Sequence, residues 1–218
     1  MKPLLPCLEF GSSTEDAEMT VILMHGLGAD AHDFAGVAEA LTSAAQPAKW
    51  RFVLPHAPHI PVTVNMGMEM PAWYDILDMS HPREVNWDTV AESTADVEAI
   101  LNRESGGKTV LAGFSQGGAM ALYTGLRNQP QIDGIFVMSG YLLEGDDHPC
   151  PEKEKDFPIS IFHGDLDPVV PFTAAEQCAA TLESKNYRPT CKIYEGLPHS
   201  VSDEEIQDVF SWLQEINH

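Results

Sequence analysis

The stretch LAGFSQGGAM, residues 111–120, lies near the middle of the 218-residue chain and holds one hydroxyl group, that of Ser115, among closely spaced glycines. Glycines at this density can cradle a phosphate, let two backbones pack closely, or form a tight turn that presents a serine for attack. An apolar run, KTVLAGF (108–114), precedes Ser115, and a helical pattern, SQGGAMALYTGLRN (115–128), starts at it. A G-x-S-x-G motif between a strand and a helix is typical of a nucleophile elbow.

Two other interpretations of the glycines are a phosphate loop and simple close packing of a helix on a sheet. A phosphate loop of the form G-x-x-x-x-G-K-[ST] needs a lysine that this stretch lacks, and its glycines do not fit G-x-G-x-x-G. Close packing alone stays open as the alternative to a nucleophile. We favour the nucleophile because a turn this tight leaves no room for side chains at Gly113 and Gly117.

Apolar runs alternate with helical patterns along the chain, which predicts parallel strands joined by helical crossovers. Several strands are continuous apolar runs, as expected of strands buried on both faces. We therefore expect a three-layer α/β fold with a mostly parallel central sheet, as one domain over residues 1–218. Residues 56–80 carry prolines and glycines without a clean period and are expected to form a long, structured loop. The strands are predicted over 19–26, 51–55, 108–114, 132–140, 159–164 and 190–196, and the helices over 31–45, 86–107, 115–128, 171–186 and 202–217.

The composition argues against several classes of partner. With 12 basic and 33 acidic side chains the formal charge is −21, which disfavours nucleic acid and anionic membrane surfaces, because both are bound by clustered Lys and Arg. The sequence has no apolar run long enough to span a membrane and no secretory pattern at its start, so we expect no stable membrane anchor. Its four cysteines show no C-x-x-C spacing, and we expect free thiols and a cytoplasmic location.

A serine hydroxyl needs a base to take its proton, and on this fold a carboxylate and then a histidine should follow it along the chain. Ligands in open α/β sheets bind beyond the carboxyl ends of the strands, so the residues that directly follow strands are the candidates. Asp165 and Asp167 follow the strand at 159–162, and His199 lies in the last loop before the last helix. Both aspartates stand in the required order, and the spacing alone does not choose between them.

An oxyanion hole needs two backbone N–H groups, one from the residue after the nucleophile and one from an early strand-to-helix loop. The first is that of Gln116, which we expect to act through its backbone more than through its side chain. The second is expected from Leu27 in HGLGAD (25–30), where glycines let the backbone turn its amides inward. We expect His25 to be structural. No H-E-x-x-H or H-x-H motif occurs, so we expect no metal site and no cofactor.

Several motifs in register resemble the small carboxylesterase and acyl-protein thioesterase family of the α/β-hydrolases, and look closest to its bacterial members. The resemblance extends from about residue 19 to residue 216 and is carried by HGLGAD, RFVLPHAP, MPAWYDI, LAGFSQGGAM, HGDLDPVVP and PHSVSDEEIQDVFSWL. It implies an α/β-hydrolase fold without a large lid domain and the hydrolysis of short to medium acyl esters. Some members act on the thioester of S-palmitoylated cysteine, and dimers occur among them, so a homodimer is an expectation here.

Carried over residue by residue, the resemblance makes Ser115 the nucleophile, Asp167 the acid and His199 the base, with the two amides named above as the oxyanion hole. The family acid is the aspartate directly before PVVP, which selects Asp167 over Asp165. The mechanism this implies is acyl transfer to water through an acyl-enzyme.

The chain departs from the family pattern around the base. Bacterial members usually carry Gly before this histidine and Glu after it, whereas here the two positions are Pro198 and Ser200. Proline fixes φ, so we expect a stiffer loop around His199. The run MSGYLL (138–143) also differs from the usual small-residue run, which would reshape one wall of the pocket.

The run PVTVNMGMEMPAWYDIL (61–77) offers an apolar groove for the acyl chain. Its candidate substrate-binding residues are Met66, Met68, Met70 and Trp73, since methionines adapt to varied chains. The alternative is a flap that packs on the core.

The substrate is expected to be a small ester or thioester. An acyl-protein thioesterase or a lysophospholipase is the alternative physiological role. Two further classes of function are a different hydrolase on the same fold, such as a small peptidase or a lactone hydrolase, and a catalytically silent binding module. A substrate panel separates the first, and the absence of Ser115 labelling by a fluorophosphonate would indicate the second.

Overall fold

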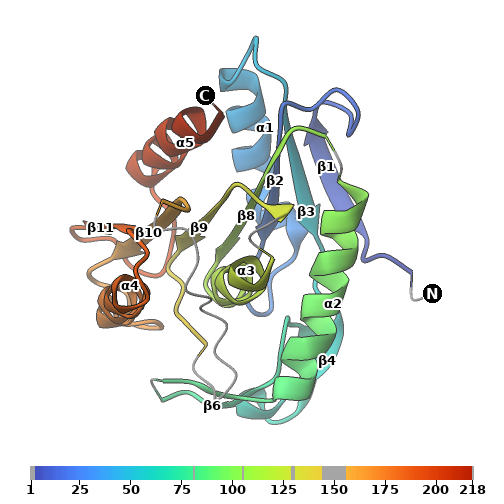
Figure 1. Ribbon diagram of the computed structural model, residues 1–218. Helices are drawn as coiled ribbons and strands as arrows, with labels where there is room; N and C mark the ends of the chain where they lie inside the picture. Colours follow the sequence, from blue (N-terminus) through green and yellow to red (C-terminus); the bar gives the residue numbers. More distant parts are fainter. Residues whose placement is uncertain (1–2, 81, 105, 129–130, 144–155, 218) are drawn as a thin grey trace.

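The computed structural model describes residues 3–217 except 81, 105, 129–130 and 144–155, and the statements below concern those residues. A seven-stranded sheet runs through the middle of the molecule in the order β1-β3-β2-β8-β9-β10-β11 (Figure 1). Every neighbouring pair is parallel except β1 with β3, so the sheet is mostly parallel, as predicted. The strands are β1 (Cys7–Gly11), β2 (Met19–Met24), β3 (Trp50–Pro55), β8 (Lys108–Phe114), β9 (Gly134–Met138), β10 (Ile159–Gly164) and β11 (Thr190–Tyr194).

Helices cover both faces of this sheet and complete the predicted three layers. Side chains of α2, α3 and α4 form one apolar cluster with the sheet, and side chains of α1 and α5 form the other. Along β2, Ile22 and Met24 belong to the first cluster and Val21 and Leu23 to the second, because successive side chains of a strand point to opposite faces. The helices are α1 (Ala35–Ala44), α2 (Trp87–Arg103), α3 (Gln116–Arg127), α4 (Thr173–Ser184) and α5 (Asp203–Asn217).

Strand β1 was not predicted from the sequence. It lies at the edge of the sheet, antiparallel to β3, and most of its residues are only partly buried. An edge strand needs neither the continuous apolar run of a central strand nor a crossover helix, so its pattern resembles that of an ordinary surface segment.

The segment expected to be a loop over 56–80 contains short regular elements. Strands β4 (His59–Val62) and β5 (Met68–Pro71) form a hairpin around a short 3-10 helix, η2 (Thr63–Asn65), and β6 (Ile76–Asp78) pairs with β7 (Glu84–Val85). These strands have two to four residues and include prolines, too short for a period to be recognised. Asp75 fixes the hairpin in place, because its carboxylate accepts hydrogen bonds from Thr63 N at 2.6 Å and Thr63 Oγ1 at 2.8 Å.

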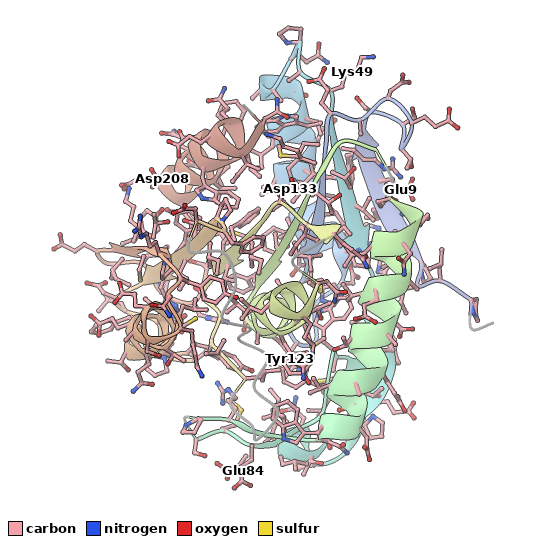
Figure 2. All side chains as sticks on the ribbon, viewed as in Figure 1. Glu9, Lys49, Glu84, Tyr123, Asp133 and Asp208 are labelled. Atoms are coloured by element: carbon pink, nitrogen blue, oxygen red, sulfur yellow. The ribbon has the colours of Figure 1, made fainter. Side chains whose placement is uncertain are left out.

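The acidic side chains are spread over the molecule, and Figure 2 shows Glu9, Glu84 and Asp208 at three separate edges. None of the described helices combines the length and the apolar character that a membrane span requires. Cys7 and Cys191 carry free thiols, whereas Cys150 lies outside the described residues.

Helix α5 begins four residues after His199, and its first turn contains half of a capping box. Ser202 Oγ accepts a hydrogen bond from Glu205 N at 3.1 Å, but the carboxylate of Glu205 makes no return bond. The side chain of Glu205 is 0% exposed, and neither of its oxygens has a partner in the described chain. Burial raises the pKa of this carboxyl group to about 7, because a charge is poorly solvated inside the protein.

Replacing Glu205 with glutamine is expected to raise the free energy of unfolding near pH 8 by up to about 3 kcal/mol. The folded chain holds the proton of Glu205 more tightly than the unfolded chain, whose carboxyl has the usual pKa of 4.5. The stability that this proton confers is complete below pH 4.5 and is lost as the pH rises through 7. Urea unfolding of the variant and the wild type below pH 4.5 and near pH 8 measures the effect. An equal difference in their free energies of unfolding at both pH values would contradict it.

Candidate active site

Ser115 stands at the turn between β8 and α3, in a backbone conformation that L-residues rarely adopt. Its φ is 54° and its ψ is −118°, and such strained residues persist only where the surrounding structure holds them. Its amide donates to Met138 O at 2.9 Å, which fixes the turn to the neighbouring strand β9. The strand-to-helix turn predicted from the G-x-S-x-G motif is therefore present.

The glycines on either side of Ser115 are required by backbone contacts. A Cβ on Gly113 would lie 2.2 Å from the carbonyl carbon of Gly117, and a Cβ on Gly117 would lie 2.2 Å from Met24 O. Both contacts are with backbone atoms, which cannot swing away as a flexible side chain can. Close packing and presentation of the serine are thus one arrangement: the packing of α3 against β2 and β8 makes the turn that presents Ser115 to the pocket.

His199 lies within hydrogen-bond distance of both Ser115 and Asp167. Its Nε2 is 3.0 Å from Ser115 Oγ, and its Nδ1 is 2.6 Å from Asp167 Oδ2. Because an ionised carboxylate can only accept, Nδ1 carries the proton and Nε2 is free to accept from the serine hydroxyl. The imidazole ring also packs on Phe114, with the ring centroids 4.7 Å apart.

The carboxylates of Asp167 and Asp165 accept hydrogen bonds from different loops. Asp167 Oδ1 accepts from the amides of Val169 and Val170, both at 2.8 Å, which leaves Oδ2 for His199. Asp165 Oδ1 instead accepts from Gly196 N at 2.7 Å. This bond ties the loop after β10 to the loop after β11, which carries His199. The geometry therefore separates the two aspartates that spacing alone could not.

The residues that depart from the family pattern form a tight turn at the histidine. Ser200 N donates to Pro198 O at 2.7 Å, so the backbone bends sharply with His199 at its centre. With Pro198 in place the imidazole still lies 3.0 Å from Ser115 Oγ.

Sequence reasoning missed His163, which is fully buried behind Asp167. Its Nε2 donates to Val170 O at 2.8 Å and lies 3.4 Å from Asp167 Oδ2. Burial lowers the pKa of His163, so the ring stays neutral at physiological pH. A histidine at the end of a buried strand is a weak signal, because nothing in the sequence shows which way it points.

Leu27 and Gln116 both line the pocket that contains Ser115. The loop that carries Leu27 is fixed by His25, whose Nδ1 donates to Gly26 O at 2.8 Å and whose Nε2 accepts from Ala57 N at 3.0 Å. Because Nδ1 donates and Nε2 accepts, the ring proton of His25 is on Nδ1. His25 is therefore structural, as predicted.

The side chain of Gln116 does more than the sequence suggested. Its Oε1 accepts from Trp73 N at 2.9 Å, and its Nε2 donates to Tyr74 O at 2.8 Å. This paired contact anchors the segment after β5 to the first turn of α3. Gln116 thus positions one wall of the pocket in addition to presenting its backbone amide.

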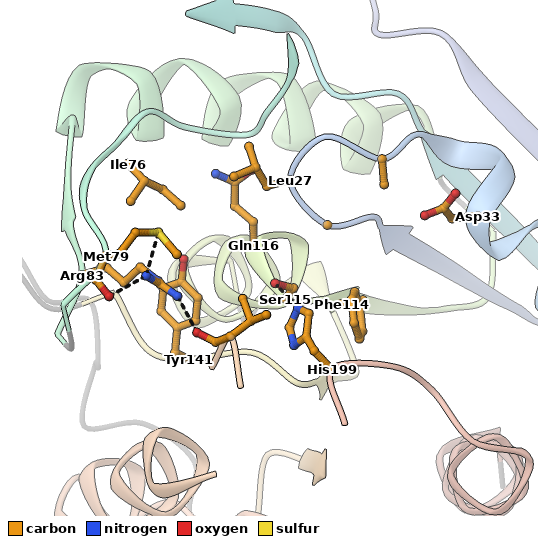
Figure 3. A pocket seen from close by; sticks show the side chains of 13 residues that line it. Leu27, Asp33, Ile76, Met79, Arg83, Phe114, Ser115, Gln116, Tyr141 and His199 are labelled. Carbon is orange, nitrogen blue, oxygen red and sulfur yellow. Dashed lines mark hydrogen bonds between the residues drawn. The ribbon is translucent and has the colours of Figure 1, made fainter. Parts of the chain in front are cut away.

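The pocket has a volume of about 320 Å³, near the lower end of the range of about 300–1,000 Å³ for small-molecule sites. Besides the serine and the histidine it is lined by Gly26, Leu27, Ala29, Asp33, Ile76, Met79, Arg83, Phe114, Gln116, Tyr141 and Val169 (Figure 3).

The four residues predicted to form an acyl groove do not line this pocket. Met66 and Met68 lie on the β4–β5 hairpin with 88% and 53% of their surface exposed. Met70 Sδ contacts Asn65 Nδ2 at 3.1 Å. Trp73 is 0% exposed, and its indole nitrogen donates to His25 O at 2.8 Å. The hairpin turns Met66 and Met68 outward and leaves Met70 partly buried, while Gln116 holds Trp73 inside the core.

Asp30, His32 and His56 are the one group in the described chain whose side chains could hold a metal ion, with ligand atoms within 4.8 Å of one another. Their arrangement has a simpler cause. Asp30 caps the 3-10 helix η1 (Ala31–Phe34) by accepting from His32 N at 2.7 Å, and His56 Nδ1 accepts from Ala31 N at 3.4 Å. We therefore assign these side chains to the stability of the loop.

Comparison with known proteins places this geometry in a family. The sequence profile of the phospholipase/carboxylesterase family matches residues 5–217. Acyl-protein thioesterase 1 of Neurospora crassa is 37% identical over 210 residues, which cover 90% of this chain and 86% of that protein. Acyl-protein thioesterase 1 of Yarrowia lipolytica is 33% identical over 208 residues, covering 90% and 91%.

Solved structures agree on the fold. The crystal structure of Arabidopsis thaliana SOBER1 is 27% identical, with a TM-score of 0.80, over 93% of this chain and 100% of that one. Acyl-protein thioesterase 2 of Zea mays is 23% identical, with a TM-score of 0.82, over 98% and 99%, and shows the same fold. Because the family profile spans nearly the whole sequence and relatives above 30% identity cover most of it, the chain belongs to the phospholipase/carboxylesterase family of α/β-hydrolase enzymes.

Proposed function

We propose that the protein hydrolyses carboxylic esters and thioesters through a covalent acyl-enzyme on Ser115. The observation that carries this proposal is the hydrogen-bonded chain from Ser115 Oγ through His199 to Asp167, whose first two members line a pocket of small-molecule size. A hydroxyl, a base and an orienting carboxylate in this order are what activation of a serine requires.

In the first half-reaction His199 Nε2 takes the proton of Ser115 as Oγ bonds to the substrate carbonyl carbon. The tetrahedral intermediate then collapses, the bond to the leaving oxygen or sulfur breaks, and the leaving group receives the proton from His199. In the second half-reaction His199 takes a proton from water as the water oxygen bonds to the acyl carbon. The bond to Ser115 Oγ then breaks, Oγ receives the proton from His199, and the carboxylic acid is released. Asp167 holds the imidazole in the correct tautomer and stabilises its charged form throughout.

The developing oxyanion would bind the amides of Gln116 and Leu27. Gln116 is the first residue of α3, where the helix dipole also favours negative charge. Loss of one such donor costs about a hundredfold to a thousandfold in rate.

The acyl group is proposed to be short to medium in length, and the leaving group to be an alcohol or a thiol. The pocket volume supports the first point, and relatives named acyl-protein thioesterase 1 support the inclusion of thioesters. We place the acyl chain against the apolar side of the pocket, which is formed by Ile76, Met79, Tyr141 and Val169.

This placement predicts that acyl-length preference responds to Met79 and not to Met68. Replacing Met79 with alanine should move the optimum to longer chains, with each accommodated methylene contributing about threefold to fourfold in kcat/KM. Met68→Ala is the matched control, since it makes the same change on the hairpin outside the pocket. Rates on p-nitrophenyl esters from acetate to palmitate measure this, and a shift with Met68→Ala alone would refute the placement.

The test of the proposed function is a substrate panel on the purified protein. It should hydrolyse oxygen esters and thioesters of short acyl groups, and turnover of peptides or lactones in preference to both would overturn the assignment. We further propose a cytoplasmic location, supported by the free thiols of Cys7 and Cys191. We also propose that the protein forms a homodimer, which analytical ultracentrifugation of the purified protein would test.

A further inference from the structure

Arg83 places a buried cation in the wall of the pocket that holds Ser115 and His199. It precedes β7, is 6% exposed, and its guanidinium carbon lies 5.5 Å from the centre of the Tyr141 ring. Figure 3 shows Arg83 beside Met79 and Tyr141, at the opposite end of the pocket from Asp33.

The guanidinium is hydrogen-bonded to uncharged groups only, and one of these is the side chain of Tyr141. Nη2 donates to Val169 O at 2.9 Å, and Nη1 donates to Met79 O at 2.8 Å. The other contact of Nη1 is with Met79 Sδ at 3.0 Å, and a thioether is a weak acceptor. Nε is buried and has no partner in the described chain. No carboxylate among the described residues forms an ion pair with Arg83.

A buried charge of this kind is unfavourable unless an opposite charge compensates it. The chain carries 33 acidic side chains against 12 basic ones. Among the described residues Asp78 interacts with Arg83 electrostatically, but no carboxylate lies within ion-pair distance of the guanidinium. A fold that keeps a nearly enclosed guanidinium in the same pocket as the serine is organised to receive an anion from the substrate.

The geometry of His199 indicates which part of the substrate carries that anion. The leaving group must lie beside His199 Nε2, because this nitrogen delivers the proton to it. His199 packs on Phe114, and Figure 3 shows Phe114 and Asp33 on the side of Ser115 away from Arg83. The acyl group therefore extends the other way, along the apolar side chains of the pocket, and its far end meets Arg83.

We infer that the acyl group ends in a carboxylate, so that the substrate class is the monoester or monothioester of a dicarboxylic acid, with Arg83 as the residue that determines this specificity. This inference rests on the proposed function. The planar guanidinium matches a carboxylate in shape as well as in charge. Met79 is 49% exposed and flexible, and its sulfur occupies a donor that a carboxylate would bind more strongly. Asp33, at the other end, disfavours an anionic leaving group.

The experiment compares two p-nitrophenyl esters of each dicarboxylic acid from succinic to suberic, one with a free terminal carboxylate and one with that carboxylate capped as a methyl ester. Spontaneous hydrolysis is measured without protein and subtracted. The wild type should show a higher kcat/KM for the free carboxylate at one or more chain lengths. Arg83→Gln should reduce the ratio of the two values about tenfold to a hundredfold, as expected for loss of hydrogen bonds to a charged group.

Arg188→Gln is the matched control. It removes the same charge from an exposed arginine whose partner is the equally exposed Asp156, 3.6 Å away, and it should leave the ratio unchanged. Arg83→Lys keeps the charge without the planar fork and should give an intermediate ratio. If Arg83→Gln does not fold, the wild-type ratio and its decrease with added salt still decide the matter.

A wild-type ratio at or below one for every acid would overturn the inference, as would equal losses on both esters in Arg83→Gln. In both cases turnover of the capped ester and labelling of Ser115 would leave the proposed function standing. Turnover of neither ester, with no labelling of Ser115, would refute the proposed function and the inference together.

Discussion

Replacing Ser115 with alanine is expected to lower kcat for p-nitrophenyl butyrate by about a millionfold, leaving only the residual rate that binding and the oxyanion hole provide. The hydroxyl oxygen 3.0 Å from His199 Nε2 is the atom that bonds to the substrate, and alanine has none to replace it. The variant should fold, because its methyl group occupies the space of the Cβ already present. Steady-state rates and circular dichroism of the purified variant measure the two effects.

Ser139→Ala is the matched control for this change. Ser139 follows the neighbouring strand β9, is fully buried and also has a positive φ, of 49°. It therefore shares the setting of Ser115 without a histidine partner, and its variant should retain most of the wild-type rate. Retained turnover in Ser115→Ala, or an equal loss in both variants, would contradict the assignment of the nucleophile.

Replacing Asp167 with asparagine should lower kcat by about ten-thousandfold, the loss known for the corresponding change in serine proteases. An asparagine in this position can donate to Nδ1, which would move the ring proton to Nε2. His199 could then no longer accept the proton of Ser115. The rate is measured on the same ester near pH 7, with thermal unfolding to show that the fold persists.

Asp165→Asn separates this effect from a general disturbance of the loop. Asp165 lies two residues away and holds Gly196 N at 2.7 Å, so an asparagine oxygen can keep the same hydrogen bond. We expect a loss of less than about tenfold, since a typical neutral hydrogen bond contributes about 1 kcal/mol. A larger loss in Asp165→Asn than in Asp167→Asn would reverse the roles of the two aspartates.

The central sheet and the order of the reactive residues could be predicted because both depend on local patterns. Buried parallel strands are continuous apolar runs, and each is followed by its crossover helix. Ser115, Asp167 and His199 all follow strands of that sheet, and the carboxyl ends of parallel strands meet at one edge. The choice of Asp167 over Asp165 needed the family resemblance, and the hydrogen bonds of the two residues give the physical reason.

The walls of the pocket could not be predicted in the same way. The hairpin of β4 and β5 turns Met66 and Met68 outward, and a run of methionines does not reveal that direction. Arg83 lies far from Ser115 in sequence. It donates to Met79 O and Val169 O, and contacts with backbone atoms cannot be recognised from the identities of the residues that carry them. The side-chain contacts of Gln116 were missed for the same reason, since its partners are the backbone groups of Trp73 and Tyr74.

The most direct test of the account is the position of the covalent adduct formed with a fluorophosphonate. Wild-type protein is treated with the probe, digested with trypsin and examined by mass spectrometry. The tryptic peptide 109–127 contains Ser115 as its one serine, which makes the assignment unambiguous. We predict a single adduct on this peptide, with labelling abolished in Ser115→Ala and greatly slowed in His199→Ala. An adduct on any other peptide, or no adduct in a wild-type sample that hydrolyses esters, would contradict the account.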